Sequence, residues 1–123
     1  MALADNSLVH MGVGFGLMGA WAAYANVAHP MPAPLIAGLL QGCLTAAITL
    51  VMKRMLEMLC RRLPGLAGLI LPPVAAFALS LTLLGAIHTA AGTPEVLATL
   101  AVPTTVATLY ATLYTYRLWS RRP

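Results

Sequence analysis

Four long apolar runs constrain this chain more than any other feature of its sequence. A helix of about 20 apolar residues is long enough to cross the hydrocarbon core of a bilayer, which is about 30 Å thick. We therefore predict an all-α membrane protein with four transmembrane helices in one domain over residues 1–123. The expected spans are residues 8–27, 34–52, 66–87 and 96–118.

The composition agrees with this class. Hydrophobic residues make up 60% of the chain and charged residues only 8%, whereas about a quarter of the residues in a soluble domain are charged. The net charge of +4 does not indicate nucleic acid as a partner, because no aromatic side chains interleave with the basic residues as a base-stacking surface requires. Lipid is the expected environment.

The basic residues predict the orientation. Four spans place both termini on the same side as the connection between the second and third spans, which includes the basic segment 53–62. The other basic residues, Arg117, Arg121 and Arg122, lie at or after the end of the fourth span, so the positive-inside rule predicts that this side and both termini are cytoplasmic. The segment is also a candidate contact for anionic lipid headgroups, although its role in topology alone would explain it. Its basic residues are Lys53, Arg54, Arg61 and Arg62.

Small residues recur at every fourth position in the first two spans. Gly12 and Gly16 do so in the first span, and Gly38 and Gly42 in the second. Helices in lipid associate through close packing of such faces. We expect these glycines to pack helices together, either the two spans of one chain or helices of different chains.

A pair of prolines interrupts the third apolar run. Pro72 and Pro73 each remove a backbone donor and crowd the preceding turn, so a kinked or broken third helix is expected. Such a break could build a binding site near the middle of the membrane, or it could only bend the helix around its neighbours. Further along, Thr93 is expected to cap the fourth helix.

A few polar side chains lie within or beside the spans and are candidates for substrate binding. Polar groups at membrane depth usually face the bundle interior or a cavity. Hydrogen bonding that only specifies helix packing is the alternative interpretation. These candidates are Asn26, His29, Gln41, His88 and Glu95.

No pattern for catalysis or metal binding is recognisable. His29 and His88 could in principle ligate a haem, but no Cys, further His or carboxylate spacing completes a metal set. No nucleophile is paired with a base. We expect no metal, no cofactor and no enzymatic activity.

The loops and the second span resemble those of a group of small four-helix bacterial inner-membrane proteins. In that group the first loop reads Asn-Thr-x-His-Gly and the second span carries Lys-Gln-Gly. This chain departs from the pattern at Val27, Pro30 and Leu40. The resemblance implies a bacterial inner membrane and no particular activity. The matching residues are Asn26, His29, Gln41, Gly42, Thr45, Arg54 and Glu57, with residues 92–95 after His88.

Together these features predict a self-associating inner-membrane protein that binds or translocates a small or lipid-like substrate near Gln41 and the outer histidines. The main alternative is a non-catalytic accessory subunit of a larger membrane complex. A b-type haem protein and a holin-like pore are further alternatives.

Overall fold

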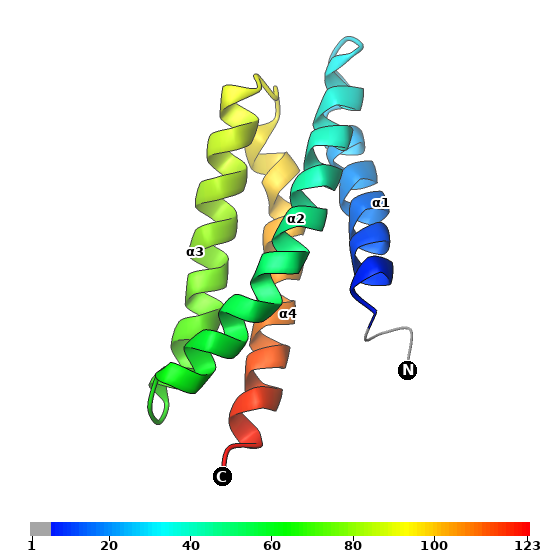
Figure 1. Cartoon of the computed structure of the whole chain (residues 1–123). Helices are drawn as coiled ribbons and strands as arrows, with labels where there is room; N and C mark the ends of the chain where they lie inside the picture. The colour runs from blue at the N-terminus through cyan, green and yellow to red at the C-terminus, as the bar shows by residue number, and fades with distance from the viewer. Residues whose placement is uncertain (1–5) are drawn as a thin grey trace.

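The chain folds into four α-helices, shown in Figure 1. The computed structural model describes residues 6–123, and within them there are helices and turns but no strand. All four helices are long and apolar enough to cross a membrane, which confirms the predicted all-α class. The helices are α1 (Ser7–Ala25), α2 (Ala33–Arg62), α3 (Ala67–Ala90) and α4 (Val96–Ser120).

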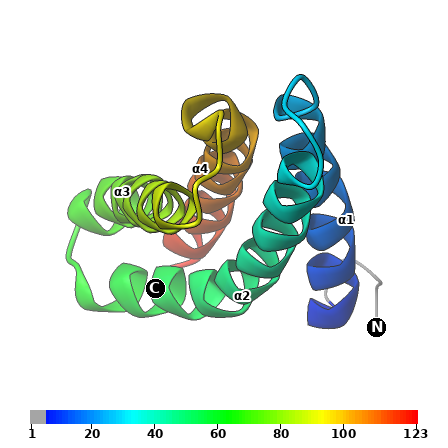
Figure 2. The ribbon, with the colours of Figure 1, turned by 90° about the horizontal axis from the view of Figure 1, so that it is seen from above.

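The helices form two hairpins, α1 with α2 and α3 with α4 (Figures 1 and 2). Residues 26–32 and 91–95 connect the helices of each hairpin at one end of the molecule, which we call the loop end. Residues 63–66 connect the hairpins at the opposite end, where the chain also terminates; we call this the turn end.

The second helix is longer than its apolar run. α2 has 30 residues, whereas about 20 are enough to cross the hydrocarbon core. It continues without interruption through the basic segment and ends at Arg62, with Leu63 as the C-cap residue. The basic residues of α2 and those after Tyr116 therefore lie toward the turn end.

The third helix is not interrupted at its proline pair. α3 runs from Ala67 to Ala90 with Pro72 and Pro73 inside it, so the expected break is corrected to a continuous helix. Both prolines lie in the second turn. A proline there removes only the bonds to the carbonyls of the first turn, and the rest of the helix keeps its ladder.

Glycines set the close approach of α1 and α2. A Cβ added to Gly19 would lie 2.8 Å from the carbonyl oxygen of Gly38, and one added to Gly38 would lie 3.0 Å from that of Gly19. Gly42 packs against the ring of Phe15. Any larger side chain at Gly19 or Gly38 would push the two backbones apart.

Toward the turn end, the two hairpins meet in an apolar cluster of Met52, Leu56, Ala76 and Ala111. The C-terminal residues fold back onto the connection between α2 and α3. Trp119 Nε1 donates to the carbonyl of Gly65 at 2.9 Å, and Arg122 Nη2 donates to that of Leu63 at 2.6 Å.

Candidate functional site

Two separate features of the structure are candidates for function. The first is a set of buried, hydrogen-bonded polar side chains near the loop end. The second is an apolar cavity between α1, α2 and α4. The candidates named from the sequence belong to the first set or to the surface beside it.

Asn26 joins the end of α1 to the beginning of α4. Its side chain is fully buried. The amide nitrogen donates to the carbonyl of Ala22 at 2.8 Å and to Thr99 Oγ1 at 2.8 Å, while the amide oxygen accepts from the backbone N–H of Glu95 at 2.9 Å. Asn26 thus satisfies a free carbonyl of one helix and a free N–H at the start of another.

The capping of α4 differs from the expectation. Thr93 was predicted to cap this helix, but the flanking residue is Glu95, and the side chain that binds its backbone N–H is that of Asn26. The hydroxyl of Thr93 instead lies 2.8 Å from His88 Nδ1. The prediction was wrong because it considered only caps that are local in sequence.

His88 connects α3 to α2. It is fully buried, and its Nε2 lies 2.8 Å from Gln41 Oε1. An amide oxygen only accepts, so Nε2 carries the proton, and Nδ1 of the neutral ring accepts from the Thr93 hydroxyl. Gln41 Nε2 in turn donates to Thr45 Oγ1 at 2.8 Å. A chain of four polar side chains therefore links the loop end to the middle of α2.

His29 and Glu95 lie at the surface of the loop end. His29 Nε2 is 3.0 Å from Glu95 Oε1, with 34% and 51% of the two side chains exposed. Asn26 binds the backbone of Glu95, and the Glu95 side chain binds His29, so these three residues form one group. His88 and Gln41 bind each other and form a second group. The structure thus divides the five predicted residues into two groups. Residues 6–123 contain no group of three or more His, Cys, Asp or Glu side chains that could hold a metal.

The glycines predicted to pack helices also fall into two groups. Gly38 and Gly42 lie in the contact of α2 with α1, as described above. A Cβ added to Gly12 or Gly16 would have no atom within 4 Å. These two glycines face away from the other three helices, and the contact of α1 uses Gly14 and Gly19 instead.

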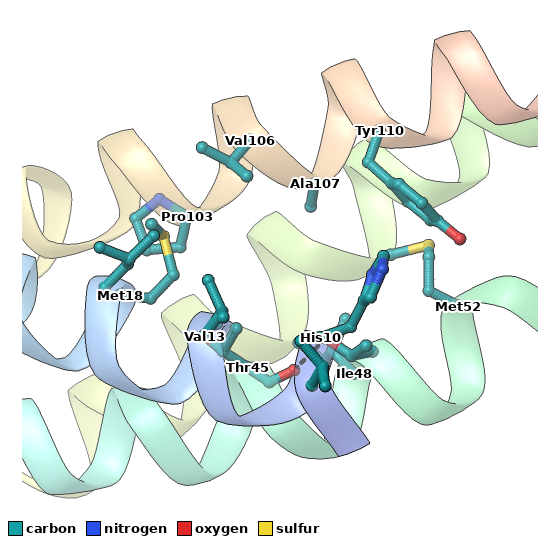
Figure 3. A pocket seen from close by; sticks show the side chains of 14 residues that line it. His10, Val13, Met18, Thr45, Ile48, Met52, Pro103, Val106, Ala107 and Tyr110 are labelled. Atoms are coloured by element: carbon teal, nitrogen blue, oxygen red, sulfur yellow. Dashed lines mark hydrogen bonds between the residues drawn. The ribbon is translucent and has the colours of Figure 1, made fainter. Parts of the chain in front are cut away.

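The cavity has a volume of about 390 Å³ and is lined mostly by apolar side chains (Figure 3). It lies between α1, α2 and α4. Trp21 Nε1 donates to the carbonyl of Ala98 at 2.9 Å, so α1 is held against the start of α4 on the loop-end side of the cavity. The lining residues with polar groups in their side chains are His10, Thr45, Thr49 and Tyr110.

Sequence reasoning did not identify this cavity. Thr45 and Thr49, four residues apart, were the available signal, because both line it and Thr45 also accepts the hydrogen bond from Gln41. None of Asn26, Gln41 and His88 lines the cavity. Gln41 and His88 bind each other, and Asn26 binds the backbone at the end of α1 and the start of α4.

No protein-family model, curated protein or solved structure matches the chain. The fold places the chain in the class of all-helical proteins with four helices long and apolar enough to cross a membrane. Within that class, this chain combines an apolar cavity with a separate, internally hydrogen-bonded polar set at one end.

Proposed function

We propose that this protein binds a lipid-like molecule within the membrane, in the cavity between α1, α2 and α4. The observation that carries the proposal is the cavity itself, which is about 390 Å³ in volume and mostly apolar. Ligand sites are typically about 300–1,000 Å³ and mostly apolar, with a few polar groups that orient the ligand. A molecule already dissolved in the bilayer would suit such a site best.

The proposed site lies away from Gln41, His29 and His88, none of which lines the cavity. Gln41 and His88 use their polar groups on each other and on the two threonines beside them. A substrate that bound there would have to replace these bonds. In the cavity, by contrast, a ligand gains apolar contact without displacing a buried hydrogen bond.

The location is part of the proposal. The concentration of basic residues at the turn end supports an orientation with that end and both termini in the cytoplasm, and the resemblance of the loops supports a bacterial inner membrane. Reporter fusions test the orientation. A C-terminal fluorescent protein should be active, and a C-terminal alkaline phosphatase inactive; the reverse pattern would contradict it.

Photo-crosslinking tests the binding. The purified protein in nanodiscs would be irradiated with a phospholipid that carries a diazirine on its acyl chain, and the labelled peptides mapped by mass spectrometry. Val106 lines the cavity and is 46% exposed. Val106→Trp should fill the space and remove most of the labelling of cavity residues.

Leu109→Trp is the matched control. Leu109 lies on the same helix, is 59% exposed and does not line the cavity, so its replacement should leave the labelling of the cavity unchanged. Equal labelling of the wild type and both variants would contradict the proposal. Movement of the bound molecule across the membrane is a separate step, which proteoliposomes containing a fluorescent lipid would measure.

The second candidate is a non-catalytic accessory subunit of a larger membrane complex; the surface that supports this role would equally support self-association. The observation that favours it is the outward face of α1, where Gly12 and Gly16 have no neighbouring atoms to contact and a helix of another chain could approach closely. Gly16→Leu should abolish copurification of a partner or of a second tagged copy in mild detergent. Ala78→Leu, on an exposed part of α3, should not. If the wild-type protein copurifies with no partner protein and with no second tagged copy, this candidate is contradicted.

A further inference from the structure

We infer that the cavity binds an anionic lipid, with one acyl chain in the apolar part of the cavity and the headgroup beside Lys53. This inference rests on the proposed function, since it names the class of ligand for the same site. It follows from the uneven distribution of polar groups along the cavity and from the charge at one of its ends.

The two ends of the cavity differ in polarity. Figure 3 shows Met18 and Pro103 at one end, and Tyr110 and Met52 toward the other, with the His10 ring on the same side as Met52 in this view. The first end lies nearer the loop end, because Met18 and Pro103 are each seven residues from the loop-end terminus of their helices. The second lies toward the turn end, because Met52 belongs to the apolar cluster found there. An amphipathic ligand would therefore place its chain toward Met18 and Pro103 and its headgroup toward the turn end.

Lys53 lies directly beyond the polar end. It follows Met52 in the sequence and lies four residues after Thr49, and both of those residues line the cavity. Residues four apart are neighbours on a helix surface, so Lys53 lies one turn beyond Thr49, at the edge of the lining face of α2. Its side chain is exposed and long enough to reach a headgroup while its stem covers apolar surface.

Within the described residues, the neighbouring carboxylate of Glu57 forms no ion pair with Lys53. Glu57, one turn further along α2, accepts a hydrogen bond from the Tyr114 hydroxyl at 3.3 Å, and the ring of Tyr114 stacks on that of Tyr110 at 5.6 Å. Across residues 6–123, the one ion pair joins His29 to Glu95. The titratable groups near this end are His10 of α1, then Lys53, Arg54 and Glu57 of α2, and Tyr110, Tyr114 and Arg117 of α4.

Charge complementarity therefore favours an anionic headgroup over a zwitterionic one. Each basic residue near a membrane surface contributes on the order of 1 kcal/mol to the attraction of anionic lipid. An isolated lysine at the surface would attract anionic lipid without any defined position. Lys53 differs because the adjoining cavity would hold the acyl chain of the same molecule.

Native mass spectrometry tests this inference. Full-length protein in detergent would be titrated with phosphatidylglycerol and with phosphatidylcholine of identical acyl chains. Wild-type protein should prefer phosphatidylglycerol, and Lys53→Gln should weaken that binding about fivefold while leaving phosphatidylcholine unchanged. Arg121→Gln removes the same charge from the turn end but outside the cavity, so it should retain the preference.

The outcomes separate the two proposals. The headgroup inference is wrong if the wild type shows no preference between the two lipids, or if Lys53→Gln and Arg121→Gln bind them alike. The proposed function still stands in that case, provided that Val106→Trp prevents binding of both lipids. If Val106→Trp binds both lipids as wild type does, the proposed function fails as well. Circular dichroism of each variant establishes that it is folded.

Discussion

The contact between α1 and α2 makes a quantitative prediction about two glycines of the same helix. In Gly19→Ala the new methyl group would lie 2.8 Å from the carbonyl oxygen of Gly38, a backbone atom that cannot turn aside. In Gly16→Ala the new methyl group would have no atom within 4 Å. The two substitutions are chemically identical and differ only in their surroundings.

Two opposing effects determine the expected magnitudes. Replacing glycine by alanine inside a helix stabilises it by about 0.5–1 kcal/mol, and both variants gain this. Forcing an extra carbon into a packed contact costs about 1–3 kcal/mol, and only Gly19→Ala incurs this cost. Gly19→Ala should therefore be less stable than Gly16→Ala by about 1–3 kcal/mol.

Unfolding in mixed micelles measures this difference. Sodium dodecyl sulfate would be titrated into the protein in a mild detergent, with helicity followed by circular dichroism. Protein would be dilute enough to be monomeric, so that association through Gly16 does not contribute. Equal free energies of unfolding for the two variants would refute the arrangement of α1 on α2 described above.

The remaining predictions concern the buried polar side chains. Asn26→Leu should destabilise the fold by about 1–3 kcal/mol in the same unfolding assay, because it leaves buried donors and acceptors of two helices unpaired; an unchanged free energy of unfolding would contradict the role of Asn26 as a shared cap. Gln41→Leu and His88→Leu should each destabilise the fold. A double-mutant cycle should give a coupling of about 0.6 kcal/mol, the average for hydrogen bonds between membrane helices, and at most about 1.7 kcal/mol. A coupling near zero would show that the two side chains do not bind each other.

Much of the fold was predictable from the sequence, and the helix bounds show why. The fourth span was expected at residues 96–118, and α4 is Val96–Ser120. The agreement is close because lipid requires each backbone segment to satisfy its own hydrogen bonds, so an apolar run of this length has little choice but a helix. The continuity of α3 through Pro72 was not predicted, because the cost of a proline depends on its distance from the start of the helix.

The candidate site was harder to predict. The sequence marks Asn26, Gln41 and His88 as unusual in an apolar chain, and all three are fully buried. Spacing along a helix does not show which neighbour each side chain meets. The bond of Asn26 to the backbone of Glu95 joins residues far apart in sequence, and no local rule for helix caps would find it.

The sequence by itself determined the class of protein, the number of candidate spans and the concentration of basic residues at the turn end, because these depend only on the lengths of apolar runs and on the order of charges along the chain. Tertiary structure decided which glycines face another helix, which polar side chains pair, and that a cavity lies between α1, α2 and α4. These depend on how each helix is rotated about its axis and on where two helices diverge. Packing between segments distant in sequence sets both, so Gly16 and Gly19 have different surroundings although they are three residues apart.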